Sequence, residues 1–244
     1  MRETMVIFRR ELKSYFLSPI AYVFGLLMLV VLLYLAVYST LQHGAQTSMQ
    51  GFFGMLPIVF MVFLPALTMR LWAEERKLGT IELLMTFPVR IGDLVLGKFG
   101  AAVVFLGFLL LMTLGLPLTL GAYGRMDWPP VVGAYLASLL FAGSFVAVGM
   151  FWSSTTRDQI VAMLLSLVSL LLLYVMGYPV LIDWMTGWTS GWMIDAINGI
   201  SPYKYFESIA RGVLDTRDIV YFACFCGFFL YANALVLHAR RHKG

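Results

Sequence analysis

Long apolar runs alternate with short polar segments along the chain. Six of the runs approach or exceed the roughly 20 residues that a helix needs to cross a bilayer core of about 30 Å. They occupy approximately residues 20 to 41, 52 to 72, 99 to 122, 131 to 153, 160 to 182 and 219 to 238. No Asp, Glu, Lys or Arg lies well inside any run, and Arg70 stands near the end of the second. The pattern predicts an all-α membrane protein with six transmembrane helices.

Residues 1 to 17 show a different, amphipathic pattern. Apolar residues recur there at helical spacing, namely Met5, Phe8, Leu12 and Tyr15 or Phe16. A helix with this pattern would lie in the headgroup plane as an interfacial helix, and a simple positive flank that fixes orientation explains the charges equally well. Ser18 and Pro19 then end the pattern, and a proline is tolerated in the first turn of the span that follows.

Prolines occur within two of the predicted spans. Pro57 and Pro65 lie in the second and Pro117 in the third. Each proline removes a backbone donor, so we expect these helices to bend.

The segment between the last two runs, residues 183 to 218, is rich in aromatic residues. Its first part contains Trp184, Trp188 and Trp192, and tryptophan favours the interface between membrane and water. In its second part, Ser201 can cap a helix whose apolar face is formed by Phe206, Ile209 and Val213. We expect a short amphipathic helix resting on the outer leaflet between spans five and six.

Composition and charge support a membrane protein and orient it. Hydrophobic residues make up 61% of the 244 residues and charged ones only 12%, with a mean hydropathy of +0.86. If both termini lie in the cytoplasm, most of the 17 Lys and Arg residues fall on the cytoplasmic side, as the positive-inside rule requires. The first outer segment, LQHGAQTSMQ, carries none. We therefore expect a multi-pass protein with both termini and the segment after the second span in the cytoplasm.

That cytoplasmic segment, residues 72 to 98, concentrates charge in an otherwise apolar chain. Gly92, Gly97 and Lys98 match most of the phosphate-binding pattern G-x-x-x-x-G-K-[ST]. However, Phe99 stands where Ser or Thr should reach magnesium, and the residues between the glycines are bulky or acidic. A nucleotide site is therefore disfavoured.

A solvated connector and a docking surface remain as interpretations of this segment. A connector would account for its charges but not for Ile81, Leu84 and Met85. Gly79 can end the helix that extends the second span, and the residues after it predict a short helix that Thr80 caps, Glu82 favours at its N-terminus and Pro88 ends. A short helix with apolar side chains and flanking charges suits a groove on a partner protein.

The residue pattern favours docking. The run AEERKLGTIELLMTFPVRIGDLVLGK resembles the signature E-x-R-x-x-G-T-x-E-x-L-x-x-x-P...GK of permease subunits of the type-2 ABC transporter family. The run SPYKYFESIARGVLDTRDIVYF resembles the segment leading into the last span of gliding-motility-type permeases, the closest subgroup. The resemblance extends over essentially the whole chain and implies a single transmembrane permease domain, residues 1 to 244.

The resemblance implies a membrane subunit that hydrolyses nothing itself. ATP and Mg²⁺ would be bound by two copies of a separate ATPase, which dock on the coupling helix of a permease dimer made of this chain and a second copy or a related permease. By similarity, the ATPase-coupling residues would be Glu74, Glu75, Arg76, Gly79, Thr80, Glu82, Leu83, Leu84 and Pro88. The resemblance further implies an exporter in the bacterial inner membrane, surrounded by lipids, with room for an auxiliary extracytoplasmic subunit and no role for nucleic acid.

Two alternatives come from other functional classes. An ion-coupled secondary transporter usually carries ionisable residues within the membrane, and the predicted spans contain none. Asn233 is the conspicuous polar residue in the last span, and hydrogen bonding between helices is the role expected of it. In the other alternative, an ATP-driven complex transmits mechanical work to an envelope partner without transporting a substrate.

Overall fold

The computed structural model describes residues 2–42, 49–81, 89–123, 126–186, 191–210 and 215–241, which form helices joined by short connections. Among these residues, six helical stretches are long and apolar enough to cross a membrane. They are Pro19–Ser39, Gln50–Lys77, Ile91–Ala122, Trp128–Thr155, Gln159–Met176 and Thr216–Ala239. The predicted number of spans and their approximate positions are confirmed.

The helices follow one another along the chain as a bundle with short additions. Helix α1 (Arg2–Leu17) precedes the first span, α2 (Pro19–Gln42). The second span consists of α3 (Gln50–Thr68) and α4 (Arg70–Lys77), and the third of α6 (Ile91–Met112) and α7 (Gly115–Tyr123). The last three spans are α8 (Trp128–Thr155), α9 (Gln159–Met176) and α13 (Thr216–Arg241). Between α9 and α13 lie α10 (Pro179–Thr186), α11 (Gly191–Ile200) and α12 (Pro202–Ala210).

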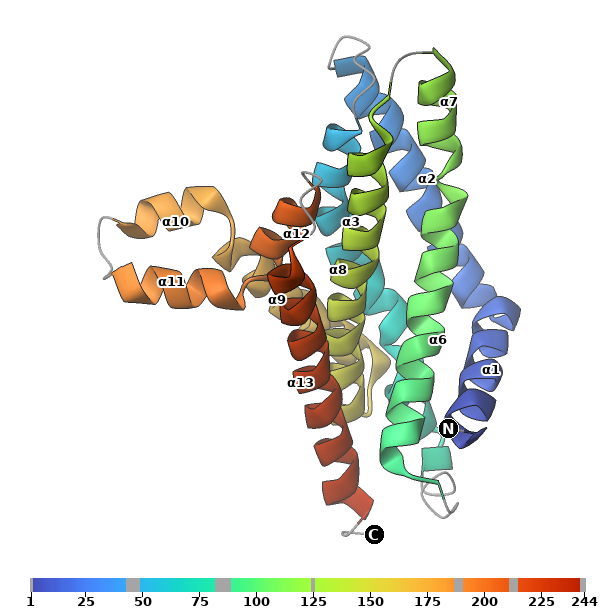
Figure 1. The fold of residues 1–244 in the computed structure, drawn as a ribbon. Helices are drawn as coiled ribbons and strands as arrows, with labels where there is room; N and C mark the ends of the chain where they lie inside the picture. The colour runs from blue at the N-terminus through green and yellow to red at the C-terminus, as the bar shows by residue number, and fades with distance from the viewer. Residues whose placement is uncertain are drawn as a thin grey trace.

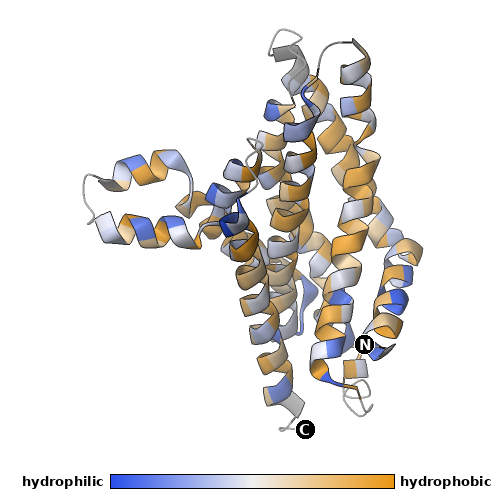
Figure 2. Ribbon diagram, viewed as in Figure 1, coloured by the Kyte–Doolittle hydropathy of each residue, from blue (hydrophilic) through white to orange (hydrophobic). Residues whose placement is uncertain are grey.

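The start of α1 and the end of α13 lie at the same end of the bundle, the lower end in Figure 1. We call it the terminal end. Helix α4 and the start of α6 are also at this end, whereas α10 and α11 project sideways from the bundle. Apolar residues run along the spans, and polar residues occur on α1, around the terminal end and on α10 to α12 (Figure 2). The terminal end is therefore one of the regions where polar groups could form a site.

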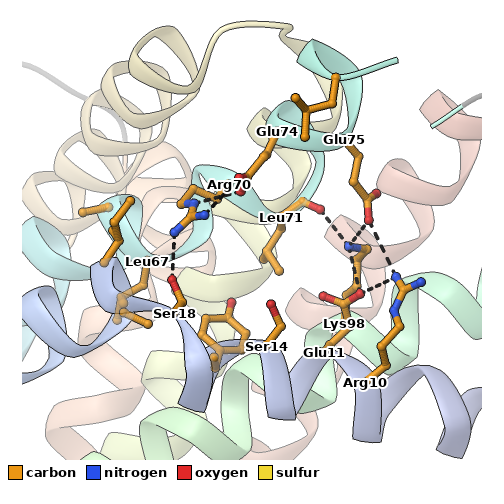
Figure 3. A pocket seen from close by; sticks show the side chains of 15 residues that line it. Arg10, Glu11, Ser14, Ser18, Leu67, Arg70, Leu71, Glu74, Glu75 and Lys98 are labelled. Atoms are coloured by element: carbon orange, nitrogen blue, oxygen red, sulfur yellow. Dashed lines mark hydrogen bonds and ion pairs between the residues drawn. The ribbon is translucent and has the colours of Figure 1, made fainter. Parts of the chain in front are cut away.

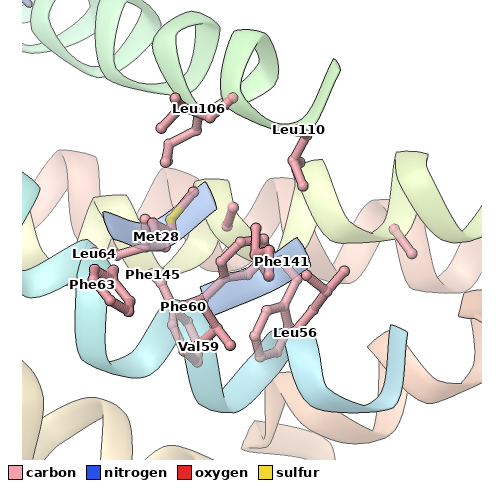
Figure 4. Close-up of a cluster of buried hydrophobic side chains, with 14 of the residues drawn as sticks. Met28, Leu56, Val59, Phe60, Phe63, Leu64, Leu106, Leu110, Phe141 and Phe145 are labelled. Atoms are coloured by element: carbon pink, nitrogen blue, oxygen red, sulfur yellow. The ribbon is translucent and has the colours of Figure 1, made fainter. Parts of the chain in front are cut away.

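The core lies where α2, α3, α6 and α8 meet (Figure 4). Leu56, Phe60, Phe141 and Phe145 are fully buried there, and the rings of Phe141 and Phe145 are 4.3 Å apart. A Cβ atom at Gly149 of α8 would lie 2.1 Å from Thr68 Oγ1 of α3. The glycine therefore lets these two helices approach more closely than any larger residue would allow.

Two of the described spans are interrupted, and only one of the two interruptions lies four residues before a proline. Helix α3 continues past Pro57 and Pro65 and is interrupted instead at Met69. In the third span, the break at Thr113 and Leu114 lies where Pro117 cannot donate to the carbonyl four residues earlier. A break thus accompanies Pro117, whereas Pro57 and Pro65 leave their helix unbroken, and the bend expected at each proline stays a prediction.

Helix α1 begins and ends as predicted, and one side of it packs against α6. Ile7 and Glu11 are buried against α6, whereas Met5, which we placed on the apolar face, is 51% exposed. A Cβ atom at Gly97 would lie 2.7 Å from Ile7 Cγ2, so the glycine of α6 provides the space for Ile7. An interfacial helix presents exposed apolar side chains to lipid, so the exposure of Met5 does not contradict the expected apolar face. The interfacial placement of α1 stays a prediction.

The segment between spans five and six also departs from expectation. Helix α9 ends at Met176 rather than near residue 182. The predicted helix after Ser201 is present as α12, and the Ser201 hydroxyl accepts a hydrogen bond from the Tyr203 backbone N–H at 3.3 Å. Its Phe206 and Ile209 are buried in the protein core, and the rings of Phe206 and Phe141 are 4.9 Å apart. The described part of the apolar face of α12 thus packs on α8. Val213 lies outside the described residues, and the position of α12 at the outer leaflet stays a prediction.

Candidate functional site

Helix α4 carries the charged part of the predicted coupling region beyond the apolar part of the second span. Its Leu71, Trp72 and Ala73 are buried, and the helix ends at Lys77. Gly79 has a φ of +70°, the left-handed conformation that commonly ends helices. The prediction that Gly79 ends this helix is confirmed.

The second part of the predicted coupling region lies largely outside the described residues. These undescribed residues, 82–88, include Glu82, Leu83, Leu84 and Pro88. Thr80 and Ile81 are helical, and the Thr80 hydroxyl donates to the Glu75 carbonyl at 3.2 Å. The short docking helix therefore stays a prediction, with its first residues helical.

A serine from α8 bridges the interruption at Met69. The Ser153 hydroxyl accepts hydrogen bonds from the backbone N–H groups of Trp72 and Ala73, at 3.0 and 3.1 Å. It donates to the Met69 carbonyl at 2.8 Å. In a continuous helix those N–H groups would donate to carbonyls four residues earlier. Ser153 therefore fastens both sides of the interruption to α8.

Arg76 makes a second link from α4 to the same helix. Its Nη1 atom donates to the Ser154 carbonyl at 2.9 Å and to the Thr156 carbonyl at 2.5 Å. Carbonyl groups at a helix C-terminus have no partner within the helix and carry partial negative charge, so a guanidinium satisfies them well. Arg76 thereby holds the last turn of α4 against the end of α8.

Lys98 of α6 is the centre of a buried ion cluster. Its side chain is 2% exposed. The Nζ atom lies 2.8 Å from Glu75 Oε1, 3.3 Å from Glu11 Oε1 and 2.9 Å from the Leu71 carbonyl. It also lies 4.9 Å from the centre of the Trp72 ring, within cation–π range. The lysine that resembled a phosphate-binding residue instead joins α1, α4 and α6.

The α1 side of this cluster consists of Arg10 and Glu11. Arg10 Nη2 donates to Glu11 Oε1 at 2.7 Å and lies 3.8 Å from Glu75 Oε1. Burial raises the pKa of Glu11, but the Lys98 charge and the Arg10 hydrogen bond together outweigh burial and hold that pKa below its usual value. The Glu11 carboxyl is therefore ionised at neutral pH and acts as a permanent partner for Lys98.

Arg70 and Glu74 form a separate pair on the neighbouring face of α4 (Figure 3). Arg70 donates from Nε to Glu74 Oε2 at 2.8 Å and from Nη2 to Glu74 Oε1 at 3.0 Å. Its Nη1 donates to Ser18 Oγ at 3.0 Å, in the connection between α1 and α2. Arg70 therefore reaches the Glu74 carboxylate with two parallel hydrogen bonds.

The structure thus brings two predicted coupling residues, Glu75 and Arg76, into contact with other helices, whereas Glu74 pairs with Arg70 of its own helix. Two other residues that hold these helices together, Ser153 and Glu11, were missed from the sequence. Ser153 is one of several serines in an apolar span, and nothing in its spacing marks it. Glu11 carried a detectable signal, since it is an acidic residue at a position that helical spacing from Ile7 places on the same face.

Neither Asn233 of the last span nor a group of metal-binding side chains adds to the site within the described residues. Asn233 of α13 is buried, and both its amide atoms lack hydrogen-bond partners within the described part of the chain. The expected hydrogen bond from Asn233 to another helix is therefore not formed there. In the same ranges, no three His, Cys, Asp or Glu side chains are grouped as they would be to hold a metal ion.

The six helices define a multi-pass membrane protein, and comparison with known families gives its class. A family model described as ABC-2 family transporter protein matches residues 5–218. The chain therefore belongs to the ABC-2 transporter family, as a membrane permease component. A search of curated proteins found no match. Permeases of this family are non-catalytic membrane subunits and generally pair with ATPase subunits.

Proposed function

We propose that this chain is one of two permease subunits of an ABC exporter, and that residues 74 to 88 transmit force from a separate ATPase. Two ATPase subunits, which bind ATP and Mg²⁺, would serve the permease dimer. The terminal end would face the cytoplasm of a bacterial cell, with the spans in the inner membrane. Within the family, the closest subgroup would be the gliding-motility-type permeases. The charge distribution and the two sequence motifs support this assignment.

The attachment of α4 to the surrounding helices carries the proposal. Ser153 and Arg76 tie α4 to α8, the Glu75–Lys98 pair ties it to α6, and the Arg70–Ser18 bond ties it to the start of the first span. A force applied just beyond Lys77 would therefore reach several spans together. Rigid-body movement of packed helices is a common route for such transitions, and stiff connections are what this route requires.

The coupling residues take different roles under this proposal. Glu74, Glu75 and Arg76 brace α4 within the permease, because their side chains already contact Arg70, Lys98 and the end of α8. Gly79 and Thr80 set the turn after α4. Glu82, Leu83 and Leu84 would then contact the ATPase, and Pro88 would end the docking helix. Charge on the ATPase side of this contact would be positive, opposite Glu82.

The experiment is a charge reversal at the proposed contact, Glu82→Arg. Because a like charge within a docked interface costs several kcal/mol, we expect at least about a tenfold loss of the ATPase subunit in co-purification. The thermal unfolding temperature of the isolated permease should stay unchanged. Glu75→Arg would be an unsuitable test, because it would also break the internal pair with Lys98.

Asp127→Arg serves as the matched control. Asp127 is exposed just before α8 starts, at the opposite end of that helix from Ser153 and Arg76. This variant should retain the ATPase in full. Equal recovery of the ATPase with Glu82→Arg and with the unaltered chain would contradict the docking assignment. Transport by the purified chain alone, driven by an ion gradient, would contradict the whole proposal.

A further inference from the structure

A cavity of about 410 Å³ opens between α1, the start of α2, the end of α3 and α4. It lies where the first two spans reach the terminal end, next to the ion cluster (Figure 3). Ser14 lies between the Arg70 pair and the Lys98 cluster in this view. The cavity thus occupies the level at which membrane spans give way to charged helices.

The charges that line the cavity balance one another. Its three cations are Arg10, Arg70 and Lys98, and its three carboxylates are Glu11, Glu74 and Glu75. Each cation lies within 4 Å of a carboxylate oxygen. A ligand with a net negative charge would leave the cavity with an unbalanced charge, whereas a ligand that carries both charges would keep it balanced.

Two buried polar atoms of lining residues lack a partner among the described residues, namely the Tyr15 hydroxyl and Glu75 Oε2. A buried polar group without a hydrogen bond is unfavourable, so such atoms point to a ligand or an ordered water. Burial, together with the Glu11 charge, raises the pKa of Tyr15, so its hydroxyl stays protonated at neutral pH. The carboxylate oxygen requires a donor, and the hydroxyl can donate or accept.

Arg70 retains donors on the same wall. Its hydrogen bonds to Glu74 and Ser18 use three N–H groups, and a guanidinium has five. Arg10 adds a side chain that is 56% exposed beside the cavity. Both guanidinium groups suit a phosphate, which is recognised by such N–H pairs.

Apolar side chains stand at the edge of the same cavity. Ile20 and Leu78 line it and are 43% and 68% exposed. Val23, one turn beyond Ile20 on α2, is 62% exposed. Apolar groups next to a charged cavity suit a ligand with a polar head and an apolar tail.

We propose that this cavity binds the head group of a phospholipid that carries a phosphate and a primary ammonium, as phosphatidylethanolamine does. The ammonium donates to Glu75 Oε2 and to the Tyr15 hydroxyl, and the phosphate lies against Arg70 and Arg10. The acyl chains leave the cavity past Ile20 along α2. The site requires that the terminal end lie at a membrane face, and it is independent of ATPase docking.

The test compares three lipids added to the purified full chain in detergent, with bound lipid measured by native mass spectrometry. Phosphatidylcholine has the same charges, but its methylated ammonium has no N–H donor, and phosphatidylglycerol is anionic. Because a hydrogen bond to a charged group changes affinity by about tenfold or more, we expect phosphatidylethanolamine to bind at least about tenfold more tightly than phosphatidylcholine. Tyr15→Phe should remove most of this preference.

Tyr34→Phe is the matched control, because Tyr34 is 67% exposed on α2 and does not line the cavity. This variant should keep the full preference for phosphatidylethanolamine. Equal binding of the ethanolamine and choline lipids would overturn the proposal, and so would a preference that Tyr15→Phe leaves intact. A final measurement tests whether soluble glycerophosphoethanolamine competes with the lipid. If it competes as strongly as the lipid, the site takes a free phosphate ester, and the lipid assignment is wrong.

Discussion

At the residue scale, the principal feature of this permease is a buried lysine whose charge is shared among three helices. Lys98 lies in the second turn of α6, and its ammonium contacts two carboxylates and a backbone carbonyl. A buried charge is stable only when it is paired and hydrogen-bonded. Lys98 therefore depends on Glu11 and Glu75, and they depend on it.

Replacing Lys98 should lower the stability of the fold. In Lys98→Met the two carboxylates lose their central partner while remaining largely buried, and removing one member of a buried ion pair costs about 3 to 5 kcal/mol. Glu11 and Glu75 side chains retain 12% and 18% exposure, so we expect a loss at the lower end, about 3 kcal/mol. Thermal unfolding of the purified protein in detergent measures this loss of stability.

Lys13→Met provides the comparison on α1. Lys13 is exposed, so the same chemical change there should alter stability by less than about 0.5 kcal/mol. A loss for Lys98→Met no larger than that for Lys13→Met would show that the ion cluster does not stabilise the fold.

At the element scale, the connection between α3 and α4 decides how the second span transmits movement. Sequence reasoning predicted one helix through about Lys77, and the two helices do continue from one to the other with only Met69 between them. What it could not supply was the bridging hydroxyl, because Ser153 follows Met69 by 84 residues. Local propensity carries no information about a partner so distant in sequence.

Removing that hydroxyl should loosen the connection. Ser153→Ala leaves the Trp72 and Ala73 N–H groups and the Met69 carbonyl without this partner, and unsatisfied buried groups cost about 1 to 3 kcal/mol. We expect a loss of stability in this range and faster hydrogen exchange at the Trp72 and Ala73 amides.

Ser154→Ala is the control for this change. The Ser154 hydroxyl donates only to the Phe151 carbonyl of its own helix, at 2.7 Å, so its removal should cost less than about 1 kcal/mol. Equal exchange rates in the two variants would mean that Ser153 does not brace α4.

The amphipathic helices α1 and α12 also show what helical spacing can and cannot predict. For α1 and α12, helical spacing predicted where each helix forms, and Ser201 does cap α12. Spacing could not determine which surface each apolar face would meet. Phe206 and Ile209 pack in the core, and Ile7 packs against Gly97 of α6, because neighbouring helices offered complementary surfaces that no periodicity records.

At the scale of the whole molecule, an even number of spans places both ends of the chain on one side. The first helix starts and the last helix ends at the same end of the bundle (Figure 1). The Lys and Arg distribution predicts that this end is cytoplasmic. The orientation can be tested without any knowledge of the substrate.

Reporter fusions test which side of the membrane the terminal end faces. Green fluorescent protein fused after Gly244 should fluoresce, because it folds in the cytoplasm, and alkaline phosphatase at the same position should be inactive. Alkaline phosphatase fused after Asp127, which follows the third span, should be active outside the cytoplasm. The opposite pattern of activities would place the terminal end, and the proposed docking segment with it, on the wrong side of the membrane.

The sequence by itself determined the number of spans, the helix end at Gly79 and the family, because each depends on local composition or on residues close together in the chain. Only the tertiary structure decided that Glu75 and Glu11 share Lys98, that Ser153 braces α4, and that a cavity with unpartnered polar atoms forms beside them. Those contacts join residues that are far apart in sequence. Packing selects them through shape and through the need to pair every buried charge.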